Sequence, residues 1–90
     1  MKNKNSLYLL IILFLGMEGV LSQSNLLDSV KRNPDNAIEM CNKFRALNNK
    51  GISANSDEAL NYVSQKNKLN QVNAEILSIY VIGLHCPNVI

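Results

Sequence analysis

Apolar residues recur at helical spacing in four stretches of the chain after residue 22, and polar or turn-forming residues separate these stretches. The first stretch covers residues 23–30. Leu26, Leu27 and Val30 share one side of it, which predicts a short helix that ends before Asn33.

The second predicted helix begins at Pro34. Asn33 is a favoured N-cap, and proline is favoured at the first helical position. The apolar residues of this segment recur at steps of one and three and form a single face: Ala37, Met40, Cys41, Phe44 and Leu47. Gly51 is the expected residue after the C-cap, where a left-handed backbone conformation commonly ends a helix.

The third predicted helix follows a linker at residues 52–55. Ser56 is its expected N-cap, and Asp57 and Glu58 in the first turn complement the helix dipole. The apolar stripe of this helix is short, and the helix is expected to end near residues 66–67. The stripe consists of Ala59, Leu60 and Val63.

The fourth predicted helix is apolar on nearly every side. Asn70 is its expected cap, with Leu69 and Ala74 placed for a hydrophobic staple, and Pro87 ends the segment. One face carries Val72, Ile76, Ile79, Tyr80 and Gly83, and the apolar arc is widened by Leu77, Val81 and Leu84. A strand over residues 79–84 is the alternative, because isoleucine and valine favour strands. The long helical period and the lack of a second predicted strand favour the helix, which must be buried or cover a partner.

The first twenty-two residues have the layout of a secretory signal peptide. Lys2 and Lys4 are followed by an uncharged apolar run at residues 7–17 and then by Val20-Leu21-Ser22. The run is shorter than the roughly 20 residues of a membrane-spanning helix. We expect cleavage after Ser22, which leaves a domain of residues 23–90 in a secreted or periplasmic location. An uncleaved leader that anchors the protein to the membrane is the alternative.

The remaining 68 residues form one small domain, whose core is marginal without a covalent link. This part has seven Lys and Arg against six Asp and Glu residues, and no basic patch. Nothing in this balance suggests a nucleic-acid partner, and the expected export argues against one.

Only two cysteines occur, Cys41 and Cys86. An even count in a short secreted chain predicts a disulfide bond. On the chain-entropy model a bond across this loop stabilises the fold by roughly 4 kcal/mol. Two free buried thiols, or an intermolecular bond, are the alternatives.

The sequence contains no recognisable arrangement of catalytic residues. His85 stands beside Cys86, but adjacent residues on a helix do not face each other. A zinc site needs about four ligands, and the chain has neither a CxxC motif nor a second histidine. Tyr62 and Tyr80 are expected at the core and its rim. We therefore expect no enzyme, no metal and no cofactor; a small hydrolase or redox protein is the least favoured class.

The segment resembles a family of short secreted bacterial domains of unknown function, best known from mycobacterial exported proteins. The residues that carry the resemblance are Cys41, Gly51-Ile52-Ser53, the apolar helix at 74–84 and Cys86-Pro87. The family usually has tyrosine or a similar residue before Cys-Pro, whereas this chain has His85. The resemblance implies a small disulfide-linked helical fold and no activity.

The sequence thus predicts an all-α bundle of three to four short helices with one disulfide, preceded by a signal peptide. The leading functional hypothesis is a non-enzymatic binding or interaction module. Its expected partner is a protein or a small apolar ligand, and weak self-association is a further hypothesis. The predicted partner surface is formed by Ile76, Ile79, Tyr80 and Gly83. The alternative is an envelope-associated structural protein that an uncleaved leader holds at the membrane.

Overall fold

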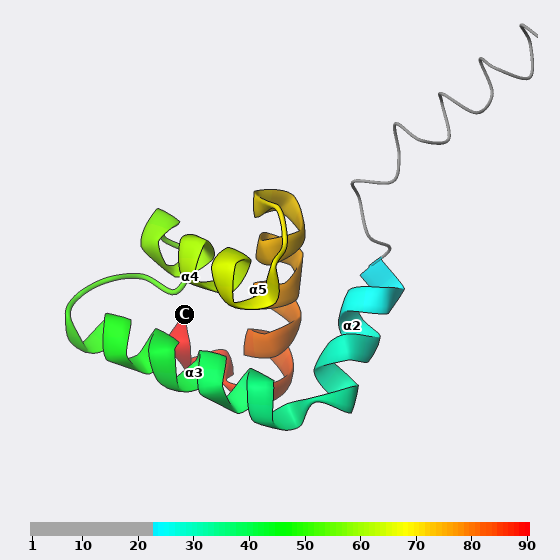
Figure 1. The fold of residues 1–90 in the computed structure, drawn as a ribbon. Helices are drawn as coiled ribbons and strands as arrows, with labels where there is room; N and C mark the ends of the chain where they lie inside the picture. The colour runs from blue at the N-terminus through cyan, green and yellow to red at the C-terminus, as the bar shows by residue number, and fades with distance from the viewer. Residues whose placement is uncertain (1–22) are drawn as a thin grey trace, which may run out of the picture.

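The computed structural model describes residues 23–90, which fold into four helices and one short 3₁₀ helix (Figure 1). The helices are α2 (Gln23–Arg32), α3 (Pro34–Asn49), α4 (Asp57–Asn67) and α5 (Gln71–His85), and the 3₁₀ helix is η1 (Pro87–Val89). No strand occurs among these residues, so the all-α prediction is confirmed and residues 79–84 are helical. The predicted signal peptide, residues 1–22, lies outside the described part of the chain.

The predicted N-caps of the last three α-helices are all present. Each cap side chain accepts a hydrogen bond from the backbone N–H three residues later, which satisfies a donor that the helix itself leaves unpaired. The pairs are Asn36 to Asn33 (3.2 Å), Ala59 to Ser56 (3.2 Å) and Asn73 to Asn70 (2.8 Å).

Helix α3 ends two residues before Gly51, the glycine predicted to follow its C-cap. Gly51 has φ +78°, and its N–H donates to the carbonyl of Asn48 at 2.9 Å. The N–H of Ile52 donates to the carbonyl of Leu47, also at 2.9 Å. This pair of bonds is a Schellman motif, and it needs the left-handed backbone that glycine adopts without strain.

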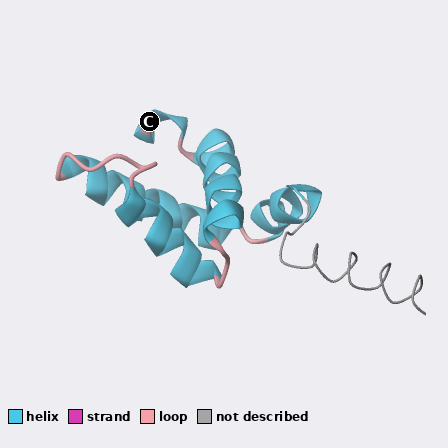
Figure 2. Ribbon diagram, turned by 90° about the horizontal axis from the view of Figure 1, so that it is seen from above, coloured by secondary structure: helices cyan, strands magenta, loops and turns pink. Residues whose placement is uncertain are grey.

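Helix α5 is the centre of the domain, because it contacts each of the other described helices and η1 (Figure 2). In Figure 1, α3 runs along one side of the fold, α5 stands across it, and η1 returns to α3. One continuous core joins them. Its most completely buried large side chains are Phe44, Met40, Leu47, Val63 and Val81. The predicted face of α3 is buried in full. No helix within residues 23–90 is long and apolar enough to cross a membrane.

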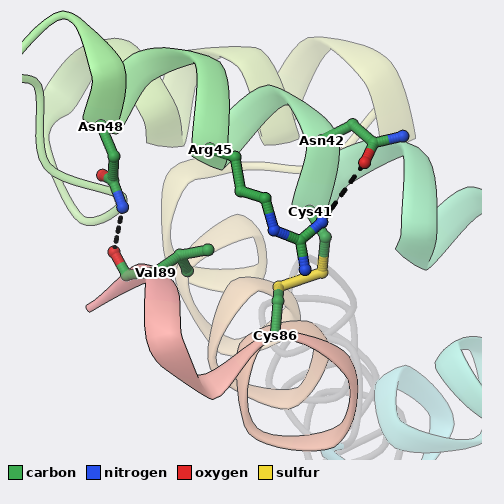
Figure 3. Close-up of a disulfide and its surroundings, with 6 residues drawn as sticks. All are labelled: Cys41, Asn42, Arg45, Asn48, Cys86 and Val89. Carbon is green, nitrogen blue, oxygen red and sulfur yellow. Dashed lines mark hydrogen bonds between the residues drawn. A yellow bond between two sulfur atoms is a disulfide. The ribbon is translucent and has the colours of Figure 1, made fainter.

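The two cysteines form the predicted intramolecular disulfide (Figure 3). Cys41 in the middle of α3 is bonded to Cys86 directly after α5, and the Cα atoms are 6.0 Å apart. Both residues are buried. A second link lies beside the bond, where Asn48 Nδ2 donates to the carbonyl of Val89 at 2.7 Å. The C-terminal end of α5 and the residues after it are thus held against α3 at two points.

Candidate interaction surface on helix α5

The inner face of α5 packs against α2, α3 and α4 and contributes six buried residues to the interior. Four of them are apolar and two are polar. The six are Asn73, Ala74, Leu77, Ser78, Val81 and Ile82. A helix that is apolar nearly all round has therefore turned two polar side chains toward the core.

Ser78 is the least favourable member of this inner face. The residue is 4% exposed, and its hydroxyl has no hydrogen-bond partner within the described part of the chain. An unpaired buried hydroxyl costs about 1–3 kcal/mol. Serine is close to alanine in size, so its volume suits a closely packed helix contact even though its chemistry does not.

The outer face of α5 carries an apolar stripe that no described element covers fully. Val72 and Ile79 are each 59% exposed and Gly83 is exposed, whereas Ile76 is half-buried and packs partly against the core. At 100° per residue these four positions fall within an arc of roughly 60°. We call Val72, Ile76, Ile79 and Gly83 the α5 stripe.

The structure brings the four predicted surface residues onto this side of α5. Ile76, Ile79 and Gly83 belong to the α5 stripe itself. Tyr80 lies at its border, where it is half-buried against the core. Val72 was not in the predicted set, although its spacing of four residues from Ile76 is the signal that places it on the same face.

Helix α5 itself carries little charge beside the α5 stripe. Glu75 is exposed one turn before Ile79, and α5 contains no lysine or arginine. His85 is exposed in the last turn of the helix. An apolar stripe edged by a single carboxylate does not suit an anionic membrane surface, because such surfaces select helices with basic flanks.

A polar contact joins α3 to α4, and α5 takes no part in it. Lys66 Nζ donates to Glu39 Oε2 at 3.0 Å, and this hydrogen bond raises the pKa of Lys66 above its usual value of 10.5. Burial raises the pKa of the Tyr62 hydroxyl; the nearby Lys66 charge opposes that shift and the Glu39 charge adds to it. The ammonium of Lys43 lies 5.4 Å from the centre of the Tyr62 ring.

This α3–α4 contact has the features of a structural interface. Its groups are paired with one another across two helices, and Asn36 Nδ2 also donates to Asn67 Oδ1 at 3.0 Å nearby. Such pairing orients α4 on α3 without leaving a reactive group aimed at solvent.

Groups that could support catalysis are scattered over the domain. Cys86, the neighbour of the single histidine, is bonded to Cys41, so neither sulfur is available as a thiolate. No group of three or more His, Cys, Asp or Glu side chains within residues 23–90 could hold a metal ion.

Comparison with known proteins places this domain in a family. No curated protein and no solved structure matches the chain. A family profile, described as a domain of unknown function (DUF8664), matches residues 27–86. The matched residues run from the middle of α2 to the second cysteine and include the disulfide and the whole α5 stripe. Because the match covers well over half of the chain, the protein belongs to the DUF8664 family.

Proposed function

We propose that this protein is an exported, non-enzymatic binding module that contacts its partner through the α5 stripe. The observation that carries the proposal is the exposure of two aliphatic side chains, Val72 and Ile79, on the helix that otherwise forms the centre of the core. Exposed apolar patches on small soluble domains commonly mark sites of interaction.

The rigidity of α5 supports a binding role. The helix packs against α2, α3 and α4 along its inner face, and the disulfide holds the chain directly after its end. A surface on such a helix is pre-organised, so its partner does not have to order it.

The disulfide and the leader support export. Disulfide bonds persist in oxidising compartments, and the first twenty-two residues have the pattern of a cleaved signal peptide. The resemblance to short secreted bacterial domains with a Cys…Gly…Cys-Pro pattern agrees with this proposal. Intact-mass measurement of the exported protein should show the loss of residues 1–22. Recovery of the full-length chain from membranes alone would instead favour the anchored, envelope-associated alternative.

The absence of an aligned catalytic group in residues 23–90 supports a non-enzymatic role. The single histidine lies beside an oxidised cysteine, and the ion pair of Lys66 with Glu39 is on α3 and α4, not on α5. A hydrolytic or redox activity that depended on His85 or Cys86 would overturn this part of the proposal.

Binding of the uncharged dye Nile red at low micromolar protein tests the surface. The variant is Ile79→Gln, and its matched control is Ile38→Gln, because Ile38 is 48% exposed on α3. We expect the control to bind dye as the wild type does and Ile79→Gln to lose most of the signal. Equal signals from the two variants would show that the α5 stripe is not the binding surface.

A further inference from the structure

The α5 stripe has the spacing of a coiled-coil seam. Its residues lie at 72, 76, 79 and 83, so the steps are four, three and four. Alternating steps of three and four keep one apolar seam facing a second helix. The stripe spans about 16 Å along the helix axis. Its shape therefore suits a helix as partner.

We propose that this partner is α5 of a second copy of the protein, packed antiparallel across the α5 stripe. The proposal rests on the proposed function, because it uses the same surface and names its occupant.

Self-complementary packing points to a second copy. When two α5 helices run antiparallel about a two-fold axis between residues 77 and 78, the stripe maps onto itself. Ile76 then lies opposite the partner's Ile79, and Val72 lies opposite the partner's Gly83. The contact then consists of four pairs of facing residues, and every member of these pairs belongs to the α5 stripe. No further element of the fold is needed.

Side-chain volume selects the antiparallel orientation. In a parallel pair Gly83 would face the partner's Gly83, which leaves a void at that layer, and voids are costly. In the antiparallel pair each glycine faces a valine. Space for that valine exists, because a Cβ built on Gly83 would meet no atom within 4 Å. The helix dipoles also oppose each other favourably in this orientation.

The size of the stripe sets the strength of the dimer. One helix face of this length is well below the roughly 800 Å² per partner of a stable protein–protein interface. We therefore expect a weak dimer with a dissociation constant in the high micromolar to millimolar range. The carboxylate of Glu75 stays at the edge of the seam, where water solvates it.

Sedimentation of the oxidised, exported protein from micromolar to millimolar concentration tests the dimer. Wild type and the Ile38→Gln control should dimerise with the same dissociation constant. Ile79→Gln should weaken association by roughly tenfold or more, because each substitution acts twice in a two-fold dimer. A wild type that stays monomeric at millimolar concentration, or a dimer that Ile79→Gln leaves intact, overturns the proposal.

A charge pair tests the orientation. Val72→Glu and Gly83→Lys should each weaken the dimer, because each places a charge in the seam. The double variant should recover association, since in the antiparallel pair every introduced glutamate faces an introduced lysine. Further loss in the double variant would overturn the antiparallel arrangement. The two positions are about 16 Å apart within one helix, so recovery cannot arise inside a monomer.

The same variants separate this inference from the proposed function. If the protein never dimerises but Ile79→Gln abolishes Nile red binding, the α5 stripe is a binding surface. Its partner is then a different molecule. If Ile79→Gln leaves dye binding unchanged, the α5 stripe is not a binding surface, and the proposed function is wrong as well.

Discussion

Helices α3 and α5 are of similar length, but they divide their residues between core and solvent differently. In α3 every buried residue is apolar, and Ile38 is its only large exposed hydrophobic side chain. In α5 the buried face includes Asn73 and Ser78, while Val72 and Ile79 lie more than half exposed. The two helices share one core and are joined by one disulfide, so the difference lies in their sequences.

Polar residues on a helix indicate which side faces water. Helix α3 has polar residues on all sides but one, so only one orientation of the helix about its axis buries its apolar face. Helix α5 has apolar residues around most of its circumference, so several orientations about its axis would bury a similar apolar area. Its rotation is restricted instead by its neighbours, because α2, α3 and α4 pack against its inner face and the bond from Cys86 to Cys41 holds its C-terminal end. The apolar surplus that remains outside is the α5 stripe.

The largest expected effect comes from cutting the link between the two helices. Cys41→Ser should destabilise the domain by about 4 kcal/mol on the chain-entropy model. That loss is comparable to the whole stability of a small domain. Thermal unfolding with and without reductant measures it, and the double variant of both cysteines should not respond to reductant. Two free thiols on alkylation of native protein would contradict the bond.

A matched pair of leucines compares a buried position of α3 with an exposed position in the last turn of α5. Leu47 is buried in α3, and Leu84 is 52% exposed on α5. Leu47→Ala should destabilise the protein by about 3 kcal/mol, because it leaves a cavity in the core. Leu84→Ala should change stability by no more than about 0.5 kcal/mol. Denaturant unfolding gives both values, and equal losses would show that Leu84 is packed as closely as Leu47.

A smaller effect, a gain in stability, is expected from a substitution on the buried face of α5. Ser78→Ala should stabilise the protein by about 1 kcal/mol, because it removes an unpaired hydroxyl and adds helix propensity. Ala37→Ser, the reverse change on the buried face of α3, should destabilise it by about 1–3 kcal/mol. Urea midpoints decide the signs. A destabilising Ser78→Ala would mean that the hydroxyl makes a bond that the structure does not show.

The smallest effect is expected at alkaline pH, at the contact of α3 with α4. Tyr62 and Lys66 both have raised pKa values in the fold. The folded protein therefore holds these protons more tightly than the unfolded chain does. Their contribution is complete below about pH 10, the usual tyrosine value, and is lost as the pH rises through the raised values. Tyr62→Phe should flatten the fall in stability above pH 10, whereas Tyr80→Phe serves as the control on α5. Identical alkaline profiles for wild type and Tyr62→Phe would contradict this assignment.

Local signals in the sequence determined the helices of the domain and their ends. The caps Asn33, Ser56 and Asn70, together with Gly51, act within a few residues of the backbone they satisfy, so no distant contact is needed to locate them. The buried face of α3 followed from its period. The disulfide was predicted from the two cysteines of a short chain whose first residues were interpreted as a signal peptide.

Only the tertiary structure decided how the C-terminal residues return to α3 and which polar side chains of α5 are buried. The hydrogen bonds from Asn48 to the carbonyl of Val89 and from Asn36 to Asn67 join residues far apart in the chain, and asparagine carries no sequence signal for such a partner. The sequence placed Ile76, Ile79 and Gly83 on the predicted partner surface of α5, but it did not place Asn73 and Ser78 in the core. Hydrophobic burial is non-directional, so an apolar helix gains similarly from several rotations, and the shapes of its neighbours select among them. That selection is what left Val72 and Ile79 on the surface.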